Sequence, residues 1–315
     1  MNYLVTGGAG FIGSHLVERL LKAGHRVTVI DNLLSGSLEN LNFPEYSSNL
    51  KVITRSITEP LEDIFNDEKF DALFHLAALP SVQFSIQNPV ETNETNVDGT
   101  LNLLDNCRAF GVKRFIFSSS CAIYGNPSKL PTPEDLAPNP LSPYALHKII
   151  GEQYCTLFTT IYGMECISLR YFNVFGPKQN PNGNYASLIP KFITMISQDK
   201  SPVINGNGAQ TRDFIFVSDV VEANIAAANT QSKECFGKVF NVGSGVSKFV
   251  NQITGNILSL AGKKIEALHG PPVIEPENAL ADIAKAKQFL DWEPRVSFED
   301  GLKETYSYFI KSWKK

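Results

Sequence analysis

The sequence is poor in the residues that build disulfide frameworks and metal sites. Its 315 residues include five cysteines, with no Cys-x-x-Cys pair, and five histidines, without the spacing of a zinc site. An odd number of dispersed cysteines is typical of thiols that are kept reduced inside the cell. We therefore expect free thiols, a cytoplasmic location and no metal.

An excess of charge and long apolar runs are also missing. The net charge of −4 gives no electrostatic case for binding nucleic acid. No apolar run approaches the ~20 residues of a membrane-spanning helix, and the chain starts on an apolar strand rather than on a signal peptide. With 43% hydrophobic and 19% charged residues, the sequence predicts a globular protein with no membrane partner, long enough for two domains.

The N-terminal residues contain a nucleotide-binding pattern. Asn2–Thr6 is a short apolar strand, an amphipathic helix follows that ends at Gly24, and Val27–Ile30 is a second strand. The loop Gly7–Gly13 joins the first strand to the helix. Its glycines allow a tight turn and close approach of the backbone to a pyrophosphate at the helix N-terminus. This βαβ unit predicts a dinucleotide site.

Asp31, at the end of the second strand, indicates which dinucleotide is bound. An acidic side chain there accepts hydrogen bonds from the adenosine ribose hydroxyls and repels a 2′-phosphate. The residues that follow, Asn32, Leu33 and Leu34, carry no positive charge. The sequence therefore favours NAD over NADP.

Strands and helices continue to alternate along the chain. We expect further strands at Lys51–Thr54, Asp71–His75, Phe115–Ser118, Glu165–Arg170, Phe214–Val217 and Val239–Val242, and helices at Pro89–Phe110, Ser142–Tyr162, Ile189–Ser197, Ser218–Asn229, Asp282–Leu290 and Phe298–Ile310. This alternation predicts an α/β fold. Residues 1–170 would form a Rossmann-type, doubly wound parallel sheet, and residues 171–315 a smaller substrate-binding α/β domain. The stretch around residues 213–242 could return to the large domain.

Two segments in the middle of the chain provide candidate catalytic groups. Phe115–Ser120 reads as a buried strand that ends in hydroxyls, and Ser142 followed by Pro143 is typical of a helix start. Tyr144 and Lys148 then lie four residues apart on one face of that helix. Because a nearby ammonium lowers the pKa of a phenol from about 10, Tyr144 is a candidate base.

These segments resemble an extended short-chain dehydrogenase/reductase, the NAD-dependent sugar-nucleotide epimerase/dehydratase group, over essentially the whole chain. The resemblance rests on Gly7–Gly13, Asp31–Asn32, His75–Ala78, Asn96–Thr100, Ser118–Gly125, Tyr144–Lys148, Arg170–Pro177 and Thr211–Phe214. Within the group, Ser81–Val82 and Pro181–Pro190 look most like UDP-hexose 4-epimerases that accept N-acetylated sugars.

The resemblance implies a transient oxidation at C4 of a UDP-hexose, with NAD as the hydride carrier. Tyr144 would take the O4 proton, Lys148 would hold the nicotinamide ribose and lower the pKa of Tyr144, and Ser120 would hydrogen-bond O4. Dehydratases of the family carry an Asp-Glu pair where this chain has Cys121 and Ala122, and decarboxylases keep the Glu. The resemblance therefore favours epimerisation, and Cys121 is interpreted as a small buried residue.

Binding residues are implied in the same way. Cofactor contacts are expected from Gly7, Gly10, Phe11, Ile12, Gly13, Asp31, Asn32, Ser35, Gly36, Ser56, Ile57, Leu76, Ala77, Ala78, Asn96, Ser118, Tyr144, Lys148 and Phe172. Substrate contacts are expected from Ser81, Ser120, Asn173, Leu188, Asn205, Arg212, Glu275 and Ala279. The chain departs from the family at Pro272, Glu275 and Ser56, which replace an expected Arg, Asp and Asp.

The resemblance also bears on specificity and assembly. The residue three before Asp282 would line the pocket beside the C2 substituent, and the small Ala279 found there leaves room for an N-acetyl group. A homodimer is implied, in which Pro89–Phe110 and Ser142–Tyr162 of both subunits pack as a four-helix bundle.

Two alternatives stay open. One is a 4-epimerase of another nucleotide sugar, such as UDP-glucuronate. The other is a non-catalytic NAD-binding sensor on the same fold, which the joint presence of Ser120, Tyr144 and Lys148 argues against.

Overall fold

Seven parallel strands form the central sheet of the computed structural model, which describes residues 1–181, 187–272 and 276–312. In spatial order they are β10 (Lys238–Val242), β6 (Glu165–Tyr171), β5 (Arg114–Ser120), β4 (Ala72–His75), β1 (Asn2–Thr6), β2 (Arg26–Asp31) and β3 (Leu50–Thr54). The chain runs outward from β1 to β3 and then from β4 to the other edge. The order therefore reverses between β1 and β4, where open α/β sheets bind their ligands.

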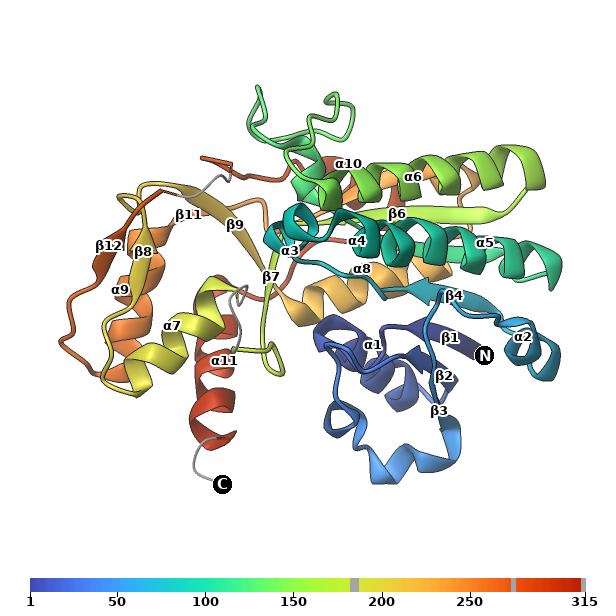
Figure 1. Ribbon diagram of the computed structural model, residues 1–315, viewed down its shortest axis with the longest axis horizontal. Helices are drawn as coiled ribbons and strands as arrows, with labels where there is room; N and C mark the ends of the chain where they lie inside the picture. The colour runs from blue at the N-terminus through green and yellow to red at the C-terminus, as the bar shows by residue number, and fades with distance from the viewer. Residues whose placement is uncertain (182–186, 273–275, 313–315) are drawn as a thin grey trace.

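Side chains of the strands alternate between two apolar layers. Tyr3 and Val5 belong to one core and Leu4 to the other, as the period of two along a strand requires. Helices α1 (Phe11–Lys22), α8 (Val217–Asn229) and α10 (Ala284–Leu290) supply the first core, and α2 (Glu62–Asp67), α5 (Gly99–Ala109) and α6 (Pro143–Tyr162) the second. Figure 1 shows α5 and α6 on one side of the sheet and α1 and α8 on the other. The predicted doubly wound sheet is confirmed.

A smaller lobe is built from the C-terminal half of the chain (Figure 1). One of its sheets has the order β11 (Ser247–Phe249), β9 (Thr211–Phe216) and β7 (Asn173–Phe175), and a second pairs β12 (Leu268–Gly270) with β8 (Val203–Asn205). Helices α7 (Leu188–Ser197), α9 (Val250–Ala261) and α11 (Phe298–Ser312) contribute to its apolar core. Between β9 and β11 the chain crosses to the large sheet, where it forms α8 and β10.

Several elements were not predicted from the sequence. Helix α9 buries Val250, Ile253 and Ile257 at helical spacing, but polar residues and Gly255 interrupt its apolar pattern. Strands β7, β8, β11 and β12 have three residues each, too few to show alternation. The short helices α2 and α3 (Val82–Gln87) were not predicted either, nor were the 3-10 turns Leu38–Leu41, Pro44–Asn49, Cys121–Tyr124 and Lys233–Cys235. The helix predicted at Pro89–Phe110 consists of α4 (Pro89–Asn93), a π-helical turn (Glu94–Asp98) and α5.

The helix predicted from Asp282 begins two residues later, at Ala284, because the Asp282 carboxylate accepts a hydrogen bond from the Ala284 N–H at 3.0 Å. None of the helices within the described ranges is long and apolar enough to cross a bilayer.

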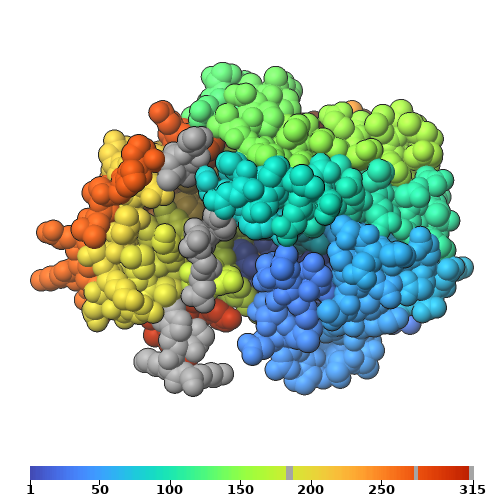
Figure 2. Space-filling model, in the orientation of Figure 1, coloured from blue at the N-terminus to red at the C-terminus, as the bar shows by residue number. Residues whose placement is uncertain are grey.

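The space-filling view in Figure 2 shows the surface hollowed between the two lobes, with N-terminal residues in dark blue at the bottom of the hollow. A cavity of about 440 Å³ is lined by Phe11, Ser35 and Asn40 of the large lobe and by Gln179 and Phe309.

Candidate active site

The glycine loop between β1 and α1 is packed too closely for side chains. Gly7 has a φ of +70°, and a Cβ on Gly13 would lie 2.1 Å from the Gly7 carbonyl oxygen. Gly10 is the N-cap of α1, whose first turn contains Phe11 and Ile12, and no described side chain caps this helix. Its first backbone N–H groups are therefore available to an anion at the reversal point of the sheet. This cradle fits the pyrophosphate of a dinucleotide.

Asp31 ends β2 with its carboxylate turned toward the glycine loop. Oδ2 accepts a hydrogen bond from the Ala9 N–H at 2.9 Å, and Oδ1 accepts one from the Leu33 N–H at 2.8 Å. Arg55, just past the end of β3, is a nearby positive charge that could attract a 2′-phosphate, but its guanidinium donates a hydrogen bond to Asp63 at 2.6 Å instead. Asn32 accepts from the Leu34 N–H at 3.1 Å. The carboxylate is held where it can accept from ribose hydroxyls, as NAD requires.

Other predicted cofactor residues pack directly against this loop. A Cβ on Gly7 would lie 2.6 Å from the Ala77 nitrogen, and one on Gly36 would lie 2.9 Å from the Ala9 carbonyl carbon. The turn Leu76–Ala78 after β4 and the segment that contains Ser35 and Gly36 therefore both contact the glycine loop.

Of the remaining cofactor candidates, Ser56 and Phe172 follow strand ends, and Asn96 lies in the π-helical turn before α5. Asn96 accepts from the Leu79 N–H at 2.8 Å and donates to the Leu79 carbonyl at 3.1 Å, so it fixes the chain after β4. Ser56 shares a hydrogen bond of 2.8 Å with Thr58, next to the buried Ile57. Phe172 is buried just beyond β6.

Helix α6 and strand β5 bring the three catalytic candidates together. Ser142 caps α6 by accepting from the Ala145 N–H at 3.2 Å, and Pro143 is its first residue, as predicted. The Lys148 ammonium donates to the Ser118 carbonyl oxygen at 2.7 Å and lies 5.9 Å from the centre of the Tyr144 ring. The Ser120 side chain lies close enough to the Tyr144 phenol to act on its pKa. A hydroxyl, a phenol and an ammonium thus meet at the end of β5.

The electrostatics of this group differ from the expectation for Tyr144. Burial raises the pKa of Tyr144 to about 12, while the nearby Ser120 hydroxyl acts to lower it. Burial also lowers the pKa of Lys148 to about 8, against an opposing effect of Glu152. The expected net lowering of the Tyr144 pKa is therefore not found in the chain itself, because desolvation of the phenol dominates.

His75 and Cys121 lie near these three residues, and their surroundings indicate a structural role and not a catalytic one. The His75 ring nitrogens hydrogen-bond to Thr6 at 2.8 Å and to Thr100 at 2.9 Å, and burial holds the pKa of His75 well below its usual value. Burial raises the pKa of the Cys121 thiol to about 12, which disfavours the thiolate that a nucleophile needs.

The predicted substrate residues are spread over both lobes. Ser81 caps α3 by accepting from the Phe84 N–H at 3.0 Å. Asn173 lies in β7, Leu188 is the first residue of α7, and Asn205 ends β8. The predicted contact Glu275 lies outside the described residues.

Arg212 and Ala279 meet where β9 is joined by a later segment of the chain. The buried Arg212 guanidinium donates to the carbonyl of Glu277 at 3.2 Å, and the Ala279 N–H donates to the carbonyl of Thr211 at 3.1 Å. Ala279 also packs against a small apolar cluster that includes Ile123, Tyr124 and Phe172, with Cys121 at its edge. The structure thus places Ala279 in the same cluster as the residue after Ser120.

Asp213 is a residue of this region whose function the sequence analysis missed. Its fully buried carboxylate accepts from the N–H and hydroxyl of Ser244 at 2.7 and 2.6 Å, and from the N–H groups of Gly245 and Ala281 at 3.0 Å each. It therefore holds the Ala279 segment against β9. An acid directly before the apolar residues Phe214–Phe216 of β9 was the available signal.

Comparison with known proteins places this arrangement in a family. A model of the NAD dependent epimerase/dehydratase family matches residues 3–243. The chain is 37% identical over 307 residues to a putative UDP-glucose 4-epimerase of Methanocaldococcus jannaschii, covering 97% of each protein. Other relatives are named as UDP-glucuronate 4-epimerases and as decarboxylases of UDP-sugar acids.

Solved structures agree with this placement. The structure of the Thermotoga maritima UDP-glucose 4-epimerase with UDP-glucose is 41% identical, has a TM-score of 0.94 and covers 99% of this chain and 100% of that one. A UDP-N-acetylglucosamine 4-epimerase from Methanobrevibacter ruminantium, in complex with UDP-N-acetylmuramic acid, is 40% identical with a TM-score of 0.93, covering 99% and 98%. This chain therefore belongs to the NAD-dependent epimerase/dehydratase family, is an enzyme, and uses NAD as its cofactor.

Proposed function

We propose that this enzyme is a 4-epimerase of UDP-hexoses that works through a transient 4-keto sugar. The observation that carries the proposal is the meeting of Ser120, Tyr144 and Lys148 at the end of β5, beside a glycine cradle that fits NAD. When bound, NAD supplies the chemistry by accepting the C4 hydride and returning it to the opposite face of the ring.

The three side chains divide the proton chemistry among them. Ser120 hydrogen-bonds the sugar O4 and passes the proton toward the neighbouring Tyr144, whose pKa it acts to lower. Tyr144 takes that proton as the base and gives it back when the sugar is reduced. Because burial raises the pKa of Tyr144, the phenolate depends on positive charge nearby, which Lys148 supplies while it holds the cofactor.

Elimination and decarboxylation are disfavoured by the two residues after Ser120. Related dehydratases and decarboxylases carry acids there, whereas Cys121 and Ala122 begin a 3-10 turn in this chain. Burial raises the pKa of the Cys121 thiol to about 12, which makes it too weak an acid to protonate a leaving hydroxyl, and Ala122 has no proton to give. The 4-keto sugar is therefore left to rotate and be reduced.

The test is to incubate the purified enzyme with UDP-glucose, UDP-galactose, UDP-GlcNAc, UDP-GalNAc and UDP-glucuronate, and to identify the products by NMR. We expect C4 epimers of the UDP-hexoses, with no net change in NAD. A dehydrated or decarboxylated product would overturn the proposal, and epimerisation of UDP-glucuronate alone would move it to acidic sugars.

Binding of the diphosphate and uridine falls to the smaller lobe in this proposal. Arg212 and Asn173 would contact the phosphates, while Leu188 and Asn205 would enclose the uridine. Arg212 suits this role because its planar guanidinium can make paired hydrogen bonds to phosphate oxygens. Ser81 would contact the sugar from α3. The free state of all five cysteines accords with a cytoplasmic enzyme, which we also propose.

We further propose that the enzyme accepts N-acetylated sugars, because Ala279 is small. Ala279→Tyr should abolish activity on UDP-GlcNAc and UDP-GalNAc and retain activity on UDP-galactose, since a bulky side chain beside C2 clashes with the acetyl group but not with a hydroxyl. Initial rates on both pairs measure this. Ala279→Ser, which keeps the site small, is the matched control and should retain both activities. Equal activity of Ala279→Tyr on the two pairs of sugars would show that Ala279 does not line the pocket beside the C2 substituent.

The active enzyme is proposed to be a homodimer that pairs α4–α5 and α6 of each subunit. Apolar side chains stand out on these helices: Val90 is 71% exposed, Leu157 48% and Ile161 63%, with Ile149 and Ile150 half-buried. Apolar groups gathered on neighbouring helices are typical of an interface.

Light scattering should therefore report twice the chain mass for the wild type at micromolar concentration. Ile161→Glu should yield monomers, because it puts a charge into the apolar contact. Leu268→Glu, at a similarly exposed apolar residue of β12 in the smaller lobe, should leave the dimer intact. A monomeric wild type would contradict this proposal.

A further inference from the structure

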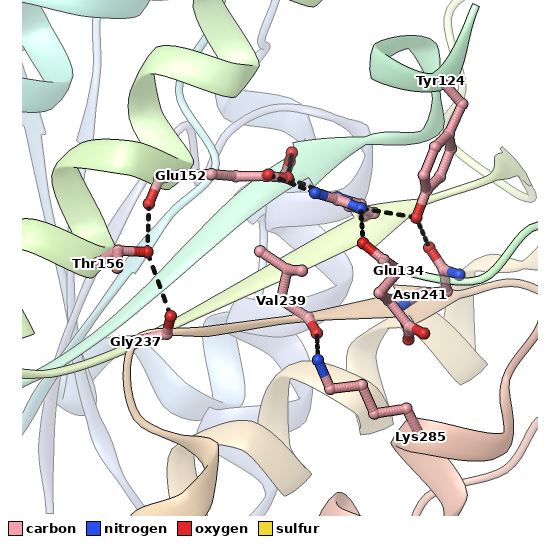
Figure 3. A network of polar contacts seen from close by, with 10 residues as sticks. Tyr124, Glu134, Glu152, Thr156, Gly237, Val239, Asn241 and Lys285 are labelled. Carbon is pink, nitrogen blue, oxygen red and sulfur yellow. Dashed lines mark hydrogen bonds and ion pairs between the residues drawn. The ribbon is translucent and has the colours of Figure 1, made fainter. Parts of the chain in front are cut away.

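A chain of buried polar side chains runs from the catalytic helix to the segment that carries Ala279, and Figure 3 shows its part from Glu152 to Asn241. It starts at Glu152, one turn after Lys148 on α6. The Glu152 carboxylate accepts a hydrogen bond from the Ser119 hydroxyl. It accepts two more from the Arg170 guanidinium, at 2.8 and 2.7 Å. In the sequence, Ser119 lies between Ser118, whose carbonyl oxygen accepts the hydrogen bond from the Lys148 ammonium, and Ser120. The first part of the chain therefore holds α6 against the end of β5.

The second part leads from Arg170 to Asn241 through one hydroxyl. Arg170 donates to the Tyr124 hydroxyl oxygen at 2.8 Å, and that hydroxyl donates to Asn241 Oδ1 at 2.6 Å. The Asn241 backbone N–H donates to the Glu134 carboxylate at 2.8 Å. Figure 3 shows Tyr124 placed between the guanidinium and the Asn241 amide. Tyr124 is 2% exposed and Asn241 fully buried, so neither side chain has water as an alternative partner.

Asn241 then joins two segments that are far apart in the sequence. Its amide N–H groups donate to the carbonyls of Thr132 at 2.9 Å and Asp282 at 3.0 Å. Those segments pair with each other, since the Thr132 N–H donates to Leu280 at 2.8 Å and the Asp282 N–H donates to Thr132 at 3.1 Å. The strip Asn278–Asp282, which we call the wall strip, is therefore fixed on one side by Asn241. Its other side is held by β9 and Asp213.

We propose that Tyr124 and Asn241 are positioning residues for sugar recognition, which set the wall strip at a fixed distance from the catalytic helix. This inference rests on the proposed function, in which Ala279 of the wall strip borders the sugar. A wall displaced by even a fraction of an ångström loses contacts with the sugar, while the uridine and phosphate contacts are made elsewhere. The network should therefore affect the binding of the hexose and not of the nucleotide.

Tyr124→Phe tests this with little change in shape, because it removes the hydroxyl and keeps the buried ring. Both Arg170 and Asn241 lose a partner, and the constraint on the wall strip is released. Binding to the NAD-loaded enzyme is measured by calorimetry for UDP, UDP-glucose and UDP-GlcNAc. We expect the Kd of both UDP-sugars to rise about tenfold, the effect of one or two lost hydrogen bonds, and the Kd of UDP to change less than about twofold.

Two further variants complete the experiment. Asn241→Asp keeps the shape but turns a carboxylate oxygen toward the carbonyls of Thr132 and Asp282, and should raise the Kd of the UDP-sugars further. Tyr3→Phe removes the hydroxyl of another buried tyrosine, which donates to the sulfur of Met1, and should leave all three affinities unchanged.

The ratio of the UDP-sugar Kd to the UDP Kd separates positioning from general damage, since a poorly folded variant weakens all three ligands alike. An unchanged ratio in Tyr124→Phe would overturn the inference while the proposed function stands. A wild-type enzyme that binds UDP but shows no added affinity for, or turnover of, any UDP-sugar would instead refute the proposed function and the inference with it.

Discussion

Replacement of Tyr144 by phenylalanine should lower epimerase turnover by about 10²–10⁴-fold, the contribution typical of a general acid–base group. The ring stays in its buried place at the start of α6, and the lost hydroxyl is the one that Ser120 contacts. Turnover of UDP-galactose should therefore fall while the Kd of UDP-galactose stays close to that of the wild type. Steady-state kinetics and calorimetry on the same preparation measure both quantities.

Tyr162→Phe is the matched control, because it makes the same change at the other end of α6, where Tyr162 is 51% exposed. Its turnover should equal that of the wild type. Lys148→Ala should lower both turnover and the NAD that copurifies with the protein, since Lys148 is proposed to hold the cofactor. Near-normal turnover of Tyr144→Phe would refute the assignment of the base.

Features of this site that depend on local spacing were predictable from the sequence. The glycine loop needs glycines at fixed offsets between a strand and a helix, and the structure shows the close contacts that require them. The start of α6 at Ser142 and Pro143 follows from the chemistry of helix ends. The alternation of strands and helices predicted the parallel sheet, because two neighbouring parallel strands must be joined by a long crossover connection, which is usually a helix.

Features that depend on burial or on distant partners could not be predicted in this way. The hydrogen bond from Tyr124 to Asn241 joins residues 117 positions apart, and no local pattern announces it. The pKa of Tyr144 was expected to be lowered because the sequence shows the ammonium of Lys148 but not the desolvation of the phenol. The wall strip is likewise held by Asp213 and Asn241, whose bonds exist only after both lobes have formed.

The largest loss of stability from a single replacement at the polar chain described above should come from Glu152→Gln. Glu152 and Arg170 form an ion pair at 2.7 Å in which both side chains are about 5% exposed or less. The neutral amide introduced by Glu152→Gln cannot compensate the positive charge of the Arg170 guanidinium, which remains protonated at any accessible pH. A buried ion pair that loses one partner costs about 3–5 kcal/mol of unfolding free energy. Urea denaturation of the variant and the wild type measures the difference.

Glu222→Gln provides the matched control for that experiment. Glu222 pairs with Arg19 at the same distance of 2.7 Å, but the two side chains are 47% and 42% exposed. Because solvent screens an exposed pair and can replace its partner, this variant should lose less than about 1 kcal/mol. Equal losses in the two variants would show that burial of the Glu152–Arg170 pair does not determine its contribution.

The same substitution should also change how the enzyme holds NAD as the pH rises. In the structure Glu152 acts to raise the pKa of Lys148, which burial lowers to about 8. Without the carboxylate the pKa of Lys148 should fall below that value, so the ammonium is lost at a lower pH. If Lys148 holds the cofactor through its charged form, NAD should dissociate from Glu152→Gln at a lower pH than from the wild type, with Glu222→Gln unchanged. Ultrafiltration at a series of pH values, followed by assay of released NAD, measures this shift. Identical release curves for Glu152→Gln and the wild type would show that Glu152 does not control the charge of Lys148.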